Sequence, residues 1–142
     1  MKCPACENQL SPLTAGNVTV DACSDGCGGI WFDNFELKKL DEPHETEGHS
    51  LSNIPKKEGL IVDTSKKRHC PKCEGIIMMR HFFSAQRRVE VDECPNCAGV
   101  WLDAGELSLI REEHQIAHEQ KLAADQERAH RFKNVARFIR PS

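Results

Sequence analysis

Eight cysteines stand in four close pairs, and the pairs fall into two sets of similar design. Two thiolates separated by two or three residues can point into one tight turn, and two such turns surround a metal tetrahedrally at about 2.3 Å. Thiolate sets favour zinc over oxygen-seeking cations. The sequence therefore predicts two Zn²⁺ ions, one held by Cys3, Cys6, Cys23 and Cys27, the other by Cys70, Cys73, Cys94 and Cys97.

Three other uses of these cysteines stay open. An iron–sulfur cluster also takes four cysteines. Four disulfides would use up an even set, but the start Met1-Lys2-Cys3-Pro4 shows no signal-like apolar segment, so we expect a reducing, cytoplasmic location. Redox chemistry at a Cys-Pro-x-Cys pair needs a βαβ context, whereas here each pair precedes a short hairpin pattern. Zinc is favoured over all three.

The chain repeats one pattern of about forty residues, first over Cys3–Leu37 and again over Cys70–Leu107. We divide it into a first module (1–40), a linker (41–69), a second module (70–110) and a C-terminal helix (111–142). Each repeat is too small for a hydrophobic core to suffice alone. Structural zinc, at about 10–16 kcal/mol per site, would supply most of its folding free energy.

Each module is expected to hold a β-hairpin between its two cysteine turns. In the first, Leu13 and Thr14 should pair with Val18 to Val20 through a turn at residues 15–17. In the second, residues 76–83 should pair with residues 87–92 through a turn at residues 84–86. The fold class is a small metal-stabilised α+β protein, with two tandem zinc ribbons, a short helix after each hairpin, and a long C-terminal helix.

Two acidic pairs read as helix caps rather than as acid–base pairs. Asp33 with Glu36 and Asp103 with Glu106 each show capping-box spacing, and a short helix should follow the first to about Leu40. From Ala104 about three dozen residues favour helix. Its first apolar residues, Leu107 and Ile110, should pack back on the second module.

The linker is acidic and carries Pro43 and Gly48, which suits a solvated segment. Residues 60–62, Leu-Ile-Val, are expected to form a small strand or to dock on a module. If the segment is flexible, it spans about 30 Å. The two modules then need not touch.

The run from Val89 to Leu107, with its Val-x-Val-Asp-x-Cys and Trp-x-Asp-x-x-Glu-Leu elements, resembles the transcription-factor-IIB-type zinc-ribbon family. Both repeats share the resemblance, which implies zinc ligation by all eight cysteines. The resemblance covers the zinc ribbons alone, and we do not expect the other domains of the initiation factor for which the family is named. The first copy departs from the pattern because Ser24-Asp25-Gly26 separates its second pair, and Gly26 would have to absorb the extra residue in a wider turn. We expect tighter zinc at the second site.

No residue pattern points to an enzyme. Trp31 and Trp101 stand at matching positions and are expected to plug the small cores, with base stacking as the alternative. His114 and His118 are four apart but lack the glutamate of a zinc-protease motif, so a solvated helix face is favoured. His69 adjoins Cys70, where four cysteines already complete the site.

Charge alternates along the chain although the net charge is only −3. Residues 54–91 carry net +5, and their basic side chains, near Phe82 and Phe83, are candidates to bind nucleic acid, with an ordinary solvated face as the equal alternative. The predicted nucleic-acid residues are Lys66, Lys67, Arg68, Arg80, Arg87 and Arg88.

The end of the C-terminal helix is basic and amphipathic, and its apolar face is Phe132, Val135, Ala136 and Ile139. The leading interpretation is a noncatalytic double zinc ribbon that binds nucleic acid or transcription-related machinery. The alternative is a protein–protein adaptor that docks this helical face on a partner or on its own copy. A variant lays the basic face on an anionic membrane. No apolar run is long enough to span a bilayer, and no small-molecule substrate is indicated.

Overall fold

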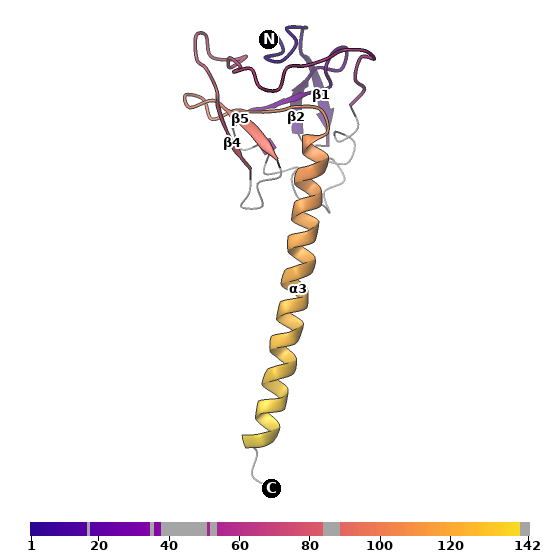
Figure 1. The fold of residues 1–142 in the computed structure, drawn as a ribbon, viewed down its shortest axis with the longest axis vertical. Helices are drawn as coiled ribbons and strands as arrows, with labels where there is room; N and C mark the ends of the chain where they lie inside the picture. The colour runs from indigo at the N-terminus through magenta and orange to yellow at the C-terminus, as the bar shows by residue number, and fades with distance from the viewer. Residues whose placement is uncertain (17, 35, 38–50, 52–53, 84–88, 140–142) are drawn as a thin grey trace.

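A computed structural model describes residues 1–16, 18–34, 36–37, 51, 54–83 and 89–139, with helix side chains described as far as Arg131. Its body is an antiparallel sheet from which one long helix extends (Figure 1). The prediction of a small α+β fold with a long C-terminal helix is confirmed. No helix in the described part of the chain is both long and apolar enough to cross a membrane.

The sheet has six strands in the order β1-β2-β3-β6-β5-β4. Each sequence repeat contributes three consecutive strands, and the two halves meet where β3 pairs with β6. The strands are β1 (Ser11–Ala15), β2 (Val18–Ala22), β3 (Ile30–Phe32), β4 (Met79–Phe82), β5 (Glu90–Glu93) and β6 (Val100–Leu102).

The seam between β3 and β6 joins the repeats into one sheet. Its antiparallel register places Trp31 opposite Trp101, with Ile30 opposite Leu102 and Phe32 opposite Val100 on either side. The expectation that the modules need not touch is therefore wrong. Three consecutive residues of β3 are buried, so other parts of the protein cover the side chains on both faces of this strand. The matching strand of the other repeat gives it a second neighbour in the sheet.

Two apolar clusters lie on the two faces of the sheet. Because side chains alternate along a strand, Ile30 and Phe32 enter one cluster while Trp31 enters the other. The first cluster also takes in the start of the helix. The second, which we call the tryptophan cluster, holds Trp31, Trp101, Leu10, Met78 and the buried cysteines Cys3, Cys23, Cys27, Cys70 and Cys94.

The linker packs on the body wherever it is described. Leu51 is only 2 % exposed and belongs to the first cluster, where Ile54 also packs. Leu60 and Val62 pack against the tryptophan cluster. Residues 60–62 form no strand, so docking is the half of that prediction that holds.

The pairing of strands follows the expected hairpin positions. β1 pairs with β2, and Ala15 lies opposite Val18. β4 pairs with β5, while the expected turn at residues 84–86 lies outside the described residues. Glu36 and Leu37 are helical, and residues 38–40 of the expected short helix lie outside the described part.

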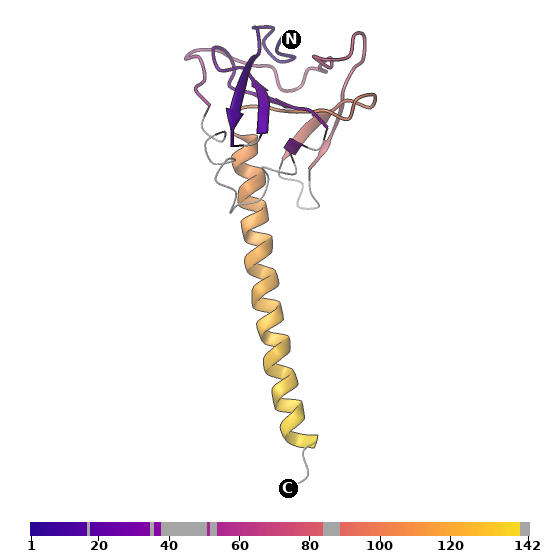
Figure 2. The same ribbon diagram turned by 180° about the vertical axis from the view of Figure 1, so that it is seen from behind.

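The helix α3 (Glu106–Ile139) begins where the capping box predicts. The Asp103 amide donates to Glu106 Oε2 at 2.7 Å, so Glu106 reaches back as a capping glutamate does. Leu107 and Ile110 are buried in the first cluster, as expected. From Gln115 to Arg131 every side chain is exposed, and the helix leaves the body as a straight stalk in both views (Figure 1 and Figure 2).

Candidate metal centres

The first four-cysteine set converges on one point. Cys3 Sγ lies 3.5 Å from Cys27 Sγ, and Cys6 Sγ lies 3.4 Å from Cys23 Sγ. All four sulfurs lie within 4.8 Å of one another. Four thiolates at about 2.3 Å from a zinc ion stand about 3.8 Å apart, so the set fits a tetrahedral Zn²⁺.

The second set has the same geometry. Cys70 Sγ lies 3.7 Å from Cys97 Sγ, and with Cys73 and Cys94 all four sulfurs again fall within 4.8 Å. No disulfide joins any of the eight cysteines. Two separate four-thiolate centres therefore fit two zinc ions, and no other group of three or more possible ligands occurs among the described residues.

Polar hydrogens surround the sulfurs. The amides of Ala5 and Cys6 donate to Cys3 Sγ at 3.4 Å, and the amide of Cys73 donates to Cys70 Sγ at 3.2 Å. Such N–H···S bonds favour thiolates, the form that binds metal. In the first turn of each repeat, backbone amides thus supply part of the polar surroundings of one sulfur.

Two asparagines add side-chain donors that sequence reasoning missed. Asn8 Nδ2 donates to Cys6 Sγ at 3.2 Å, and Asn96 Nδ2 donates to Cys73 Sγ at 3.2 Å. Asn8 reaches a cysteine of its own turn, whereas Asn96 reaches across to the other turn. In the sequence, the only indication of this role is that Asn8 lies close to a cysteine pair and Asn96 lies within one.

The pKa shifts of the cysteine thiols indicate that a bound cation would stabilise both sites. The hydrogen bond from Cys3, ahead of other donors, lowers the pKa of Cys27 to about 6, while the same contact and burial raise the pKa of Cys3 far above its usual range. At the second site burial raises the pKa of Cys70 to about 12. Four sulfurs this close cannot all be ionised by hydrogen bonds alone. A divalent ion removes that conflict.

Cys94 is the acidic thiol of the second centre. Burial opposes its ionisation, but the amides of Cys97 and Asn96 outweigh burial and lower the pKa of Cys94 to about 7. Those amides donate to its sulfur at 3.4 Å each. Backbone amides of the second cysteine turn therefore favour the thiolate form of Cys94.

Gly26 accommodates the extra residue of the Cys23–Cys27 turn. A Cβ atom at Gly26 would lie 2.6 Å from Cys23 Sγ, 2.7 Å from Asn8 Nδ2 and 3.0 Å from Cys6 Sγ. No larger residue fits without displacing a ligand. The wider first-site turn is thus compatible with a converged centre because glycine stands at this position.

The two tryptophans are core residues, as predicted, and neither offers a ring for stacking. Both are fully buried. Trp31 Nε1 donates to Asp33 Oδ1 at 3.2 Å, and Trp101 Nε1 donates to Asp103 Oδ1 at 3.2 Å. Each aspartate therefore ties the buried indole to the start of the following helical turn.

Each capping glutamate lies beside its aspartate. Glu36 Oε2 accepts from the Asp33 amide at 3.0 Å, which repeats the bond at Glu106. Burial, with the Asp103 charge second, raises the pKa of Glu106 to about 8. The cause is a helix start folded into the core, which agrees with the prediction of a cap rather than an acid–base pair.

Arg68 lies inside the protein, which removes it from the predicted nucleic-acid surface. Its side chain is only 2 % exposed, and Nη1 lies 2.6 Å from Asp103 Oδ1 and 3.4 Å from Asp92 Oδ2. Sequence reasoning grouped it with its lysine neighbours and missed the two acids. Asp92 lies in β5 and Asp103 lies shortly before α3, and Arg68 supplies the cation between them.

The other predicted basic residues divide into three groups. Arg80 is partly buried and bonds Asp92 Oδ1 at 3.1 Å and the Lys66 carbonyl at 3.1 Å. Lys66 and Lys67 are exposed. Arg87 and Arg88 lie outside the described residues.

The predicted partner face of the C-terminal helix is only partly described. Its four residues lie on the described backbone of α3, but their side chains lie outside the described part: Phe132, Val135, Ala136 and Ile139.

A hollow of about 710 Å³ lies between the first cysteine turns of the two repeats. Because its walls come from both repeats, it exists only when the six-stranded sheet is assembled. Its lining includes both Cys-Pro starts and three exposed lysines, Lys2, Lys66 and Lys67.

The histidines that the structure describes take no part in either centre. His69 is exposed on the wall of the hollow, outside both four-cysteine sets. His114 lies against Phe83, with ring centroids 6.0 Å apart. His118 is exposed on the stalk, in agreement with the predicted helix face.

Comparison with known proteins returns one family. A family model of the transcription-factor-IIB zinc-ribbon type, described as a transcription factor zinc-finger, matches residues 2–43 and 69–113. The two matched stretches include all eight cysteines and more than half of the chain. No curated protein matches significantly. No solved structure matches significantly.

Proposed function

This chain belongs to the transcription-factor-IIB-type zinc-ribbon family, and from that premise we propose that it is a noncatalytic zinc protein that binds nucleic acid within transcription-related machinery. Its two zinc centres serve structure. Each cysteine has three sulfur neighbours within 4.8 Å, which leaves no thiolate for catalysis once zinc is bound. The function therefore depends on what binds to the surface of the fold that the two zinc centres stabilise.

The observation that carries the proposal is the hollow between the two first cysteine turns. Lys2, Lys66 and Lys67 line it and are exposed, and Lys66 and Lys67 form no ion pair with another described residue. Lysines along a groove attract a phosphate backbone and release its counterions. Glu7 is the one acid on the wall, so the lining is net positive.

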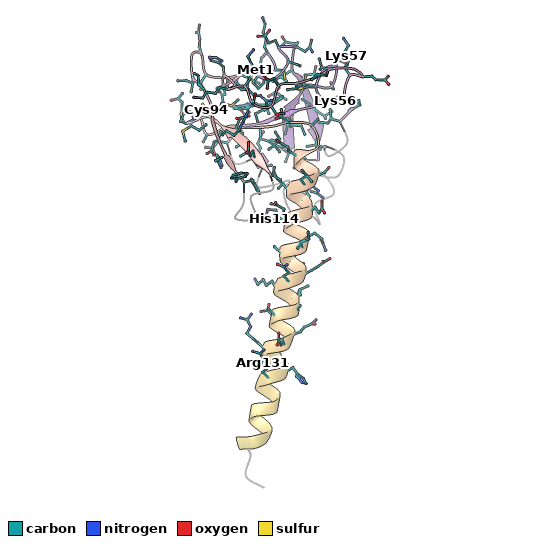
Figure 3. The ribbon with its side chains drawn as sticks, in the orientation of Figure 1. Met1, Lys56, Lys57, Cys94, His114 and Arg131 are labelled. Carbon is teal, nitrogen blue, oxygen red and sulfur yellow. The ribbon has the colours of Figure 1, made fainter. Side chains whose placement is uncertain are left out.

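The test is fluorescence anisotropy with labelled single-stranded and duplex DNA and RNA over a salt series. We expect Lys66→Glu/Lys67→Glu to weaken binding at least about tenfold at low salt and to reduce the slope of log K against log salt by about two. The matched control is Lys56→Glu/Lys57→Glu, an exposed pair also at the end of the body opposite α3 (Figure 3). We expect that control to change affinity less than about threefold.

Equal losses in the two double variants would show that general charge, and not the hollow, attracts nucleic acid. Binding that is absent or insensitive to salt would end the nucleic-acid proposal. Zinc content is measured for every variant, so that a lost ribbon is not mistaken for a lost contact.

A second candidate function is a protein–protein adaptor, and one specific observation favours it. The part of α3 from Gln115 to Arg131 contacts solvent on every side, although a helix this polar gains little from standing alone. Ile116 and Leu122 are 40 % and 47 % exposed. A partner helix or a second copy would cover them.

Deletion of residues 118–142 tests the adaptor candidate. The adaptor function predicts loss of an assembly, measured as molar mass by light scattering or as a partner recovered from the native cell after nuclease treatment. Unchanged mass and unchanged partners after deletion would remove this candidate. The nucleic-acid candidate predicts that the hollow keeps most of its affinity in the truncated chain.

A further inference from the structure

We propose that the two zinc centres load and release their ions as one unit, coupled by tryptophans that each repeat inserts beside the metal turn of the other. The inference is independent of what the hollow binds. It rests on contacts across the β3–β6 seam, where sequence repetition gave no reason to expect any contact.

The first contact joins Trp101 of the second repeat to Gly29 of the first. A Cβ atom at Gly29 would lie 2.2 Å from Trp101 Cζ2 and 2.7 Å from Trp101 Cη2. The indole therefore lies directly against the backbone of the first metal turn, in space that any side chain would need. Trp101 is fully buried there.

The second contact is the reciprocal one. A Cβ atom at Gly99 of the second repeat would lie 2.2 Å from Cζ2 and 2.5 Å from Cη2 of Trp31. The two tryptophans stand opposite each other in the register of β3 and β6. The two repeats therefore exchange equivalent parts, which makes each dependent on the other for the packing of its metal turn.

Each glycine is tied directly to a metal ligand. The Cys23 amide donates to the Gly29 carbonyl at 2.9 Å, and the Cys94 amide donates to the Gly99 carbonyl at 2.9 Å. Two contacts thus connect the tryptophan of one repeat with a zinc ligand of the other. A change in the turn that follows metal loss alters the surface on which the opposite tryptophan packs.

The packing of both centres in one apolar cluster also supports coupling between them. Cysteines of both centres and both tryptophans share the tryptophan cluster. Neither half has enough apolar residues for a core of its own, and close-packed interiors transmit a local change rather than absorb it. Release of one ion should therefore lower the affinity of the other centre, which is a coupling free energy between sites.

The unmodified protein provides the first test. Native mass spectrometry follows the two-zinc chain during slow removal by a chelator. Coupled release predicts that two-zinc and zinc-free species dominate, and that the one-zinc species never exceeds about a tenth of the total. A one-zinc species that reaches about half of the total, as independent release from two equivalent sites requires, would overturn the proposal.

Site-resolved labelling provides the second test. The chain is treated with a thiol-alkylating reagent during chelation, and peptide mass spectrometry measures how fast each of the eight cysteines reacts. In the full-length Trp31→Phe variant we expect Cys94 and Cys97 of the opposite repeat to react at least about fivefold faster than in the unmodified chain. In Trp101→Phe we expect the same of Cys23 and Cys27.

The control is Val20→Ala, a buried residue of β2 that belongs to the first cluster and not to the tryptophan cluster. It is expected to accelerate alkylation first in its own repeat. Acceleration confined to the substituted tryptophan's own repeat would contradict reciprocal coupling. If a tryptophan variant does not fold, the chelation experiment on the unmodified chain decides the matter alone.

Discussion

At the residue scale, Arg68 is the most informative single side chain outside the metal centres. It is buried between Asp103 and Asp92, and the same aspartate accepts the Trp101 indole hydrogen. Its position ties the start of the second repeat to the start of α3. A buried cation between two acids stabilises the fold only while all its partners remain.

Arg68→Met should lower the free energy of unfolding by about 3 kcal/mol, because it leaves Asp103 without its cation and leaves the buried Asp92 with Arg80 as its only cation among the described residues. Chemical denaturation with zinc present measures the change. Lys67→Met removes one positive charge from the exposed neighbouring residue and should change stability by less than about 0.5 kcal/mol. Similar effects for the two variants would show that Arg68 contributes only charge.

Glu106 predicts a distinct pH dependence. Burial and then the Asp103 charge raise its pKa from 4.5 to about 8, so the folded chain binds a proton that the unfolded chain has already lost. Stability from this group is greatest below about pH 4.5 and is lost as pH rises toward 8.

Glu106→Gln removes that titration and keeps an acceptor for the Asp103 amide. Relative to the variant, the unmodified protein should become steadily less stable as pH rises from about 5 to about 8, as measured by urea midpoints with saturating zinc. Effects of pH on the thiolates are common to both proteins and cancel in the difference. A difference that is constant over this range would contradict the assignment.

The residue types at the centres were predictable, whereas their supporting contacts were not. Cysteine spacing states the ligand set directly, because few other arrangements use eight cysteines in repeated pairs. The burial of Arg68 depends on Asp92 and Asp103, which lie far from it in sequence. Spacing along the chain carries no information about such a contact.

At the element scale, α3 joins two different environments. Its first turns belong to the core, since Leu107 and Ile110 are buried with the sheet, and its side chains from Gln115 to Arg131 are exposed. Capping and propensity predicted both the start and the length of this helix. Local signals suffice here because the helix is continuous and its cap lies within one turn.

Ile110→Ala should cost about 3 kcal/mol of stability, because it leaves a cavity between α3 and the sheet. Ile116→Ala makes the same chemical change six residues later, where the side chain is 40 % exposed, and should cost less than about 1 kcal/mol. Thermal or denaturant unfolding compares them. Equal costs would mean that the stalk also packs on the body or on another copy.

At the scale of the whole molecule, the two repeats form one folded unit and not two separate modules. The sheet order places both metal-bearing halves around the β3–β6 seam, and the linker fills the core with Leu51. The sequence repeat predicted the cysteine ligands and the hairpin of each half. It did not predict that the two halves form one continuous sheet. Trp31 lies opposite Trp101, which is 70 residues away in the sequence, so no local pattern predicted this seam.

The central claim is that eight cysteines hold two zinc ions in one zinc-dependent fold. Native mass spectrometry of protein purified without chelators or added metal, paired with alkylation under native conditions, tests it most directly. We predict a chain carrying two zinc ions, with all eight cysteines protected until a chelator both exposes them and abolishes the β signal in circular dichroism. A metal-free chain that is folded, or one whose mass shows disulfides, would contradict the account.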